Sequence, residues 1–134
     1  MTLQQRLDRM YDLRRQGYNC TQSLILCFPD LTGLDDETAA RITSGLGSGV
    51  GGLGEICGAA NGIALVVGSQ YSANPADKAA AAATTRELCS IFASANGGRI
   101  NCRDLKGKEG IRPCNQLIAQ AIEILHNKYC ADEA

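Results

Sequence analysis

Seven cysteines are the side chains in this chain of 134 residues that are best suited to redox or metal chemistry. A thiolate attacks disulfides and binds soft metal ions, so the sequence leaves both kinds of chemistry open. The odd number, together with an N-terminus that lacks the apolar core of a signal peptide, argues against a fixed framework of structural disulfides. We therefore expect a cytoplasmic protein whose cysteines are redox-active or bind a metal.

Four of the cysteines fall where the sequence predicts the first turn of a helix. They are Cys20, Cys57, Cys102 and Cys114. Free backbone N–H groups and the helix dipole stabilise an anion there, which lowers the pKa of a thiol. We expect these four to be catalytic thiols or, alternatively, the ligands of one metal centre. At least three of their sulfur atoms should converge, and Cys20 and Cys57 should be alkylated before Cys89.

The other three cysteines and the single histidine are expected to have packing roles. Cys27 lies seven residues after Cys20, on the same face of a predicted helix but about 10 Å along it, too far for a disulfide. Cys89 falls in the middle of a predicted helix, and Cys130 falls in a chain end that is expected to fray. His126 lies in a predicted last helical turn, where a cation suits the helix dipole.

The spacing of the cysteines excludes several common sites. No two cysteines are separated by two residues, which excludes zinc-ribbon, rubredoxin-like and thioredoxin motifs. The absence of Cys-x-x-Cys-His excludes covalently attached haem. No paired acids, Ser-His-Asp set or histidine cluster indicates a hydrolase. Any site must therefore be assembled by contacts between distant parts of the chain.

Helical patterns cover most of the sequence, and no alternating strand pattern is present. Capping signals, glycine stops and apolar spacing predict helices over 3–16, 20–28, 36–44, 55–71, 75–96, 102–107 and 113–129. We predict an all-α, single-domain compact bundle of six or seven helices spanning residues 1–134. The helix over 55–71 is rich in small residues, including Gly58 and Gly62, so neighbours can pack close to its axis and it should be central.

Six glycines between residues 45 and 54 predict a tight loop before that helix. The loop contains the dinucleotide pattern G-x-G-x-x-G, but it follows a helix rather than a strand, and no Lys-Ser or Lys-Thr completes a phosphate loop. We therefore expect no nucleotide site. Instead, the loop should bring backbone amides toward a group held by Cys57, with Gly52, Gly54 and Gly58 next to any cofactor.

Charge and hydropathy exclude two classes of partner. Thirteen basic and 14 acidic residues give a net charge of −1, so no broad basic surface is available for nucleic acid. The longest strongly apolar stretch, residues 56–67, is much shorter than the roughly 20 residues that a membrane span needs. We expect neither nucleic-acid binding nor a membrane span, whereas a homo-oligomer is compatible with the sequence.

Four blocks of sequence resemble one family of small bacterial proteins. They are Gly17-Tyr-Asn-Cys20-Thr-Gln, Cys57-Gly-Ala-Ala-Asn-Gly62 after the glycine loop, Cys102-Arg-Asp-Leu, and Cys114. Together they resemble the C-GCAxxG-C-C family of redox-active proteins over nearly the whole chain. The resemblance implies an all-helical fold with four shared cysteines. A similar domain occurs in split-Soret cytochromes beside haem and an iron–sulfur centre, so the resemblance also implies an iron–sulfur cluster as an alternative.

Two redox functions and one non-redox function therefore remain open. The first is a dithiol/disulfide electron carrier that acts with an unidentified redox partner. The second is a module that binds an iron–sulfur cluster or another thiolate-bound metal. The third is a non-catalytic helical interaction domain in which the cysteines only pack.

Overall fold

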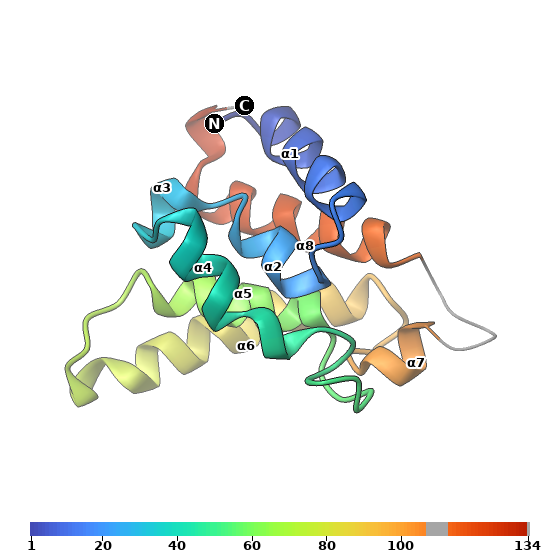
Figure 1. The fold of residues 1–134 in the computed structure, drawn as a ribbon. Helices are drawn as coiled ribbons and strands as arrows, with labels where there is room; N and C mark the ends of the chain where they lie inside the picture. Colours follow the sequence, from blue (N-terminus) through green and yellow to red (C-terminus); the bar gives the residue numbers. More distant parts are fainter. Residues whose placement is uncertain (107–112, 134) are drawn as a thin grey trace.

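The computed structural model describes residues 1–106 and 113–133, and over these ranges the chain is all-helical, as predicted (Figure 1). No β-strand forms within them; a single isolated bridge joins Ile56 to Asn101. The α-helices are α1 (Leu3–Arg15), α2 (Cys20–Ile25), α3 (Pro29–Thr32), α4 (Asp36–Ile42), α5 (Gly58–Gly68), α6 (Lys78–Ser94), α7 (Cys102–Lys106) and α8 (Cys114–Tyr129). The predicted end of the α7 segment at Gly107 lies outside the described residues.

The eighth helix arises because α2 is shorter than expected. Its capping box forms as predicted: Asn19 Oδ1 accepts from Gln22 N at 2.8 Å, and Gln22 Oε1 accepts from Asn19 N at 2.9 Å. The helix ends at Ile25, and Pro29 then opens α3 instead of only stopping the previous helix. Proline is tolerated at a first helical position because its missing N–H would have no partner there.

Helix α5 is the central helix, as its small residues predict. It packs against α2, α6 and α8, and Ala59, Ile63 and Val66 are fully buried. A Cβ at Gly62 would lie 2.8 Å from Leu24 Cδ2, so the glycine allows α2 to cross very close to α5. The helix starts at Gly58 rather than at residue 55, because residues 55–57 pair with the segment before α7 instead of continuing the helix.

Two ends of the bundle carry different groups (Figure 1). The chain termini lie side by side at one end, where the Met1 ammonium is 2.9 Å from the Glu133 carboxylate. The N-termini of α2, α5, α7 and α8 gather at another end, below the C-terminal end of α1. Within the described residues, no helix combines the length and the apolar content needed to cross a membrane.

Candidate functional site

The four cysteines at the starts of α2, α5, α7 and α8 line one small cavity. Its volume is about 10 Å³, and Gly58, Leu117 and Ile118 complete its wall. Among these four residues, Cys57, Cys102 and Cys20 are buried, with exposures of 5%, 6% and 7%. Cys114 is partly exposed. The structure therefore brings all four predicted site residues together and leaves Cys114 as the most accessible of them.

Contacts of its neighbours fix Cys20 at the start of α2. Asn19, which caps this helix, donates through Nδ2 to Ser44 O at 3.1 Å and so ties α2 to the beginning of the glycine loop. Thr21 Oγ1 donates to Gly58 O at 2.9 Å. A Cβ at Gly58 would lie 2.8 Å from Cys20 Cβ. The glycine of the central motif is therefore required so that α2 and α5 can approach each other beside the cavity.

A short backbone ladder holds Cys57 and Cys102 together. Cys57 N donates to Ile100 O at 2.8 Å, and Cys102 N donates to Glu55 O at 2.6 Å. These two bonds flank the bridge between residues 56 and 101. Cys57 is consequently the N-cap of α5, so the prediction that it lies in the first turn of this helix is wrong. Cys20, Cys102 and Cys114 are first helical residues, as predicted.

The glycine loop covers this ladder in an unusual conformation. Five consecutive residues, 48–52, have positive φ, including the non-glycine residues Ser48 at 52° and Val50 at 66°. A Cβ at Gly49 would lie 2.8 Å from Cys102 Cβ. Gly49 is thus the loop glycine whose missing side chain allows the loop backbone to pack against Cys102. The sequence pattern did not indicate this glycine.

The two loop glycines predicted to lie next to a cofactor have other contacts. A Cβ at Gly52 would meet no atom within 4 Å, and one at Gly54 would lie 3.2 Å from Arg103 Cβ. Both glycines have positive φ, so the backbone conformation itself favours glycine at these positions. A role of Gly52, Gly54 or Gly58 in holding a cofactor stays a prediction.

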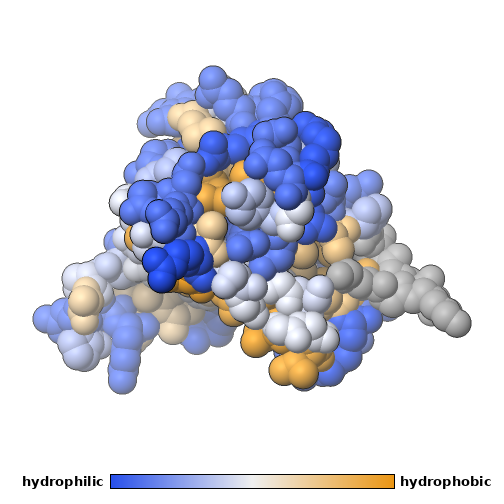
Figure 2. All heavy atoms as spheres, in the orientation of Figure 1, coloured by the Kyte–Doolittle hydropathy of each residue, from blue (hydrophilic) through white to orange (hydrophobic). Residues whose placement is uncertain are grey.

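The tip of the glycine loop is apolar and faces solvent. Val50, Leu53 and Ile56 are 39%, 70% and 39% exposed. Figure 2 shows apolar side chains gathered over this part of the molecule, below the centre of the view. None of these three residues is part of the cavity lining.

Cys20 and Cys114 form a directly interacting pair. Their thiols are hydrogen-bonded to each other, and the Arg14 guanidinium lies close enough to Cys20 to favour its thiolate. Arg14 Nε donates to Asn115 Oδ1 at 2.9 Å, and Arg14 Nη1 donates to Tyr18 O at 3.0 Å. Sequence reasoning missed Arg14, because nothing in the pattern of α1 shows that its C-terminal end reaches this site.

The prediction of lowered thiol pKa values is wrong for two of the four cysteines. The hydrogen bond with Cys114 and then burial raise the pKa of Cys20, although Arg14 opposes the shift. Burial also raises the pKa of Cys57 and outweighs the effect of the backbone N–H groups of Ala59 and Ala60. The stabilisation expected at a helix start is therefore present at Cys57, but desolvation of the buried thiolate is larger.

The cavity also tests the two kinds of metal centre that the sequence left open. Four thiols are a suitable donor set for one soft metal ion. However, a cavity of about 10 Å³ has room for about one water-sized sphere, so in this conformation it does not fit an iron–sulfur cluster. Among the described residues, no three of the four cavity sulfur atoms lie within 4.8 Å of one another, so the predicted convergence of at least three sulfurs is wrong for this conformation, which does not present three thiolates to one ion.

The three other cysteines lie away from the cavity. Cys27 is beyond the end of α2 and not on its face with Cys20; its Sγ donates to Ser23 O at 3.1 Å and to Arg6 O at 3.2 Å. Cys89, in α6, is partly buried, and its Sγ lies 3.8 Å from Ala60 O of α5. Cys130 is 7% exposed and accepts a hydrogen bond from Arg6 Nη2 at 3.3 Å, so this chain end is not frayed as expected.

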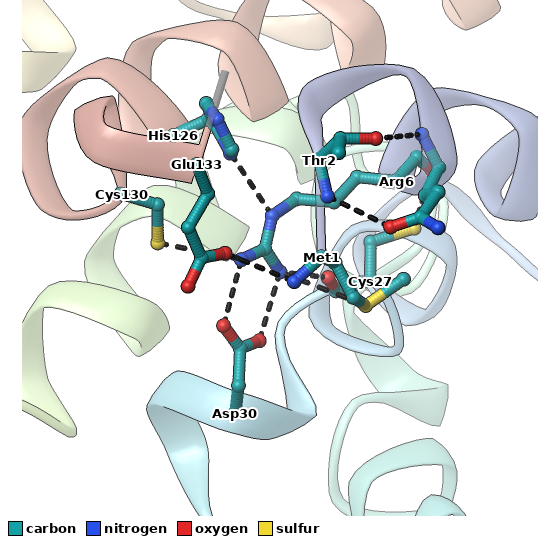
Figure 3. Close-up of polar contacts among 9 residues, drawn as sticks. Met1, Thr2, Arg6, Cys27, Asp30, His126, Cys130 and Glu133 are labelled. Carbon is teal, nitrogen blue, oxygen red and sulfur yellow. Dashed lines mark hydrogen bonds and ion pairs between the residues drawn. The ribbon is translucent and has the colours of Figure 1, made fainter.

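Arg6 is the centre of a second buried polar cluster, shown in Figure 3. Its side chain is fully buried and makes two hydrogen bonds to Asp30, at 2.7 and 2.8 Å. Its Nε donates to His126 Nδ1 at 3.1 Å, and its guanidinium stacks 4.4 Å from the centre of the Phe28 ring. Asp30, Cys130 and Glu133 offer three potential ligand atoms within 4.8 Å of one another, but the Arg6 guanidinium already supplies the positive charge there.

Comparison with protein families gives one match that agrees with this geometry. The family described as "Putative redox-active protein (C_GCAxxG_C_C)" matches residues 18–128, which include all four cavity cysteines. Comparisons with curated proteins and with solved structures give no match. Since the match covers most of its length, the chain belongs to the C_GCAxxG_C_C family.

Proposed function

We propose that this protein is a dithiol/disulfide electron carrier that is oxidised and reduced at the cavity cysteines. The observation that carries the proposal is the hydrogen-bonded thiol pair, Cys20 and Cys114, inside a cavity that two further thiols line. Two thiols in contact need only a small movement to form a disulfide, because the bond requires close Cβ atoms rather than a new fold. None of the seven cysteines takes part in a disulfide in this structure.

Burial of the site agrees with exchange against a specific partner. Three of the four thiols are at most 7% exposed, so large oxidants reach them poorly. A partner disulfide would enter at Cys114, the partly exposed member of the set. The family name supports a redox role in general, and a reducing compartment such as the cytoplasm would keep the free thiols available for it.

The test is a thiol count across a series of glutathione redox buffers, with anaerobic purification, an absorption spectrum and metal analysis beforehand. We expect a colourless protein that loses two thiols on mild oxidation and regains them on reduction. Cys20→Ser should abolish the loss of two thiols and leave at most a loss of one, as a glutathione adduct, whereas the matched variant Cys89→Ser should retain the loss of two, because Cys89 lies outside the cavity. A brown protein containing iron and acid-labile sulfide would contradict the proposal.

A further inference from the structure

The two thiols of the hydrogen-bonded pair differ in accessibility, and this difference assigns them different chemical roles. Cys20 is 7% exposed and lies behind the contact of α2 with α5. Cys114 opens α8 and is partly exposed. Thiol–disulfide exchange requires nearly linear access of the attacking sulfur to the disulfide, so the accessible thiol reacts first.

Arg14 bridges the two chain segments that carry these cysteines. Its Nη1 donates to the carbonyl of Tyr18, two residues before Cys20, and its Nε donates to the side chain of Asn115, the residue after Cys114. A guanidinium makes such a two-directional contact because its N–H donors have a fixed fork geometry. Arg14 therefore links the end of α1 to the starts of both α2 and α8.

We propose that Cys114 attacks the incoming disulfide, that Cys20 resolves the resulting mixed disulfide, and that Arg14 is a positioning residue for this second step. This assignment rests on the proposed dithiol function. It adds to that function the order in which the two thiols react, and a positioning role for Arg14, which lies outside the four-cysteine motif.

The reaction balances without any further reagent. The Cys114 sulfur attacks one sulfur of a partner disulfide, the partner S–S bond breaks, and the first partner thiol leaves. The Cys20 sulfur then attacks the Cys114 sulfur, the mixed disulfide breaks, and the second partner thiol leaves. Two protein thiols give up two protons and two electrons and become the Cys20–Cys114 disulfide, while the partner disulfide is reduced to two thiols.

Oxidised glutathione serves as the probe for the order of attack. In the Cys20→Ser variant, a glutathione adduct should accumulate at Cys114, because the thiol assigned to resolve it is absent. In the Cys114→Ser variant, the adduct at Cys20 should form at least about tenfold more slowly, since access controls the rate. Rapid acid quenching of the unsubstituted protein should show a transient adduct at Cys114 by peptide mass spectrometry, and this readout does not depend on how well either variant folds.

The positioning role is tested by a pair of neighbouring arginines. Arg14→Gln should leave release of the first glutathione unchanged and slow release of the second by about tenfold, the size expected when reacting groups lose alignment. Arg14→Lys should not restore the rate, because an ammonium lacks the fork. Arg15→Gln is the matched control: Arg15 is 70% exposed on its side chain, and this change should alter neither step.

Each outcome separates the assignment from the function on which it rests. A transient adduct at Cys20, Cys57 or Cys102, or an unchanged second step in Arg14→Gln, would overturn the assignment while the disulfide still forms. A protein that keeps its glutathione adducts and never forms an internal disulfide would overturn the proposed function itself. Thermal unfolding of each variant shows whether Arg14 acts only on the fold, in which case both steps would change together.

Discussion

The bundle buries sulfur in two places, and their surroundings differ sharply. At the end where the chain termini meet, Cys130 accepts a hydrogen bond from Arg6, whose guanidinium also contacts Asp30 and His126. At the other end, Cys20 and Cys114 contact each other, and the Arg14 guanidinium lies near Cys20. The Cys130 thiol is one acceptor in a network of charged groups, whereas the Cys20 and Cys114 thiols face each other.

This difference shows that burial alone does not tell whether a cysteine has a redox role or a structural one. Cys130 and Cys20 are equally exposed, at 7%. What separates them is the neighbour: a thiol beside another thiol can form a disulfide, and a thiol beside a guanidinium stabilises the position of that cation. We therefore expect substitutions around Arg6 to change stability and substitutions around Cys20 to change redox behaviour.

The largest expected effect is that of Arg6→Ala on the free energy of unfolding. The change removes a fully buried guanidinium and leaves the Asp30 carboxylate and His126 Nδ1 without their donor. Because the Asp30 side chain is 36% exposed, the loss comes mainly from the space that the guanidinium filled and from the unpaired His126 Nδ1, and we expect about 2–4 kcal/mol, which urea denaturation would measure. Thiol–disulfide exchange, measured where the variant is still folded, should be unaffected.

The matched control for this prediction is the exposed Arg15 on the same helix. Its nearest carboxylate oxygen, on Asp12, is 3.6 Å away, and both side chains are mostly exposed. Arg15→Ala should therefore change the free energy of unfolding by no more than about 0.5 kcal/mol. Equal losses in the two variants would mean that the Arg6 cluster contributes no more than a surface ion pair.

Gly58→Ala is expected to have the next largest effect, and it acts at the cysteine end. The new Cβ would lie 2.8 Å from Cys20 Cβ and 3.3 Å from Thr21 N, neither of which moves easily. We expect a loss of about 1–3 kcal/mol in the free energy of unfolding, and slower exchange because Cys20 is displaced. Urea denaturation and the glutathione assay measure the two effects.

Gly62→Ala is the control for position along the same helix. Its Cβ would meet Leu24 Cδ2 and Cδ1 at 2.8 and 2.9 Å, which are the far end of a flexible side chain. The loss should therefore be smaller than for Gly58→Ala, and exchange should remain unchanged. If Gly62→Ala slowed exchange as much as Gly58→Ala, the effect would come from the packing of α5 in general and not from contact with Cys20.

Most of the fold and the membership of the site were predictable from local sequence signals. The capping boxes at Thr2 and Asn19, the acids at the start of α4 and the small residues of α5 act within one or two helical turns, so the sequence shows them directly. The four cysteines followed from their predicted helix starts and from the resemblance to a family. The helix starts are local signals, and the resemblance to a family depends on short sequence motifs.

The errors concern features that depend on distant contacts. The pKa values of Cys20 and Cys57 depend on burial against other helices, which outweighs the local effect of a helix start. Arg6 and Cys130 are 124 residues apart, so their contact has no local signal. The left-handed turn over residues 48–52 includes Val50, whose residue type would argue against positive φ.

The pH dependence of stability provides a smaller test of the Arg6 cluster. Burial and then the neighbouring Arg6 lower the pKa of His126 in the folded protein. The unfolded chain therefore takes up a proton near pH 6.5 that the folded chain does not bind, so stability falls as the pH drops below about 6.5. The slope cannot exceed about 1.4 kcal/mol per pH unit for one proton.

His126→Asn separates this contribution from those of the surrounding charged groups. Asparagine keeps an acceptor for Arg6 but does not titrate, so the slope between pH 7 and pH 5 should flatten. The lowered pKa of Asp30 affects stability only at more acidic pH, where its carboxylate takes up a proton. Since His126 is the only histidine, an unchanged slope in the variant would show that its burial does not control the acid sensitivity.

The smallest expected effect is a gain in stability from Val50→Gly in the glycine loop. A β-branched residue at a φ of 66° is strained by about 1–2 kcal/mol, and glycine removes this strain while adding about 0.5–1 kcal/mol of unfolded-chain entropy. The net gain should be below about 1 kcal/mol by urea denaturation. Leu53→Gly is the control, because Leu53 is exposed in the same loop without positive φ and should lose stability instead. Opposite signs for the two variants would show that the glycine loop at the cysteine end has a strained backbone, whereas the Arg6 end is held by a network of charged hydrogen bonds. A loss of stability in both would remove that contrast between the two ends.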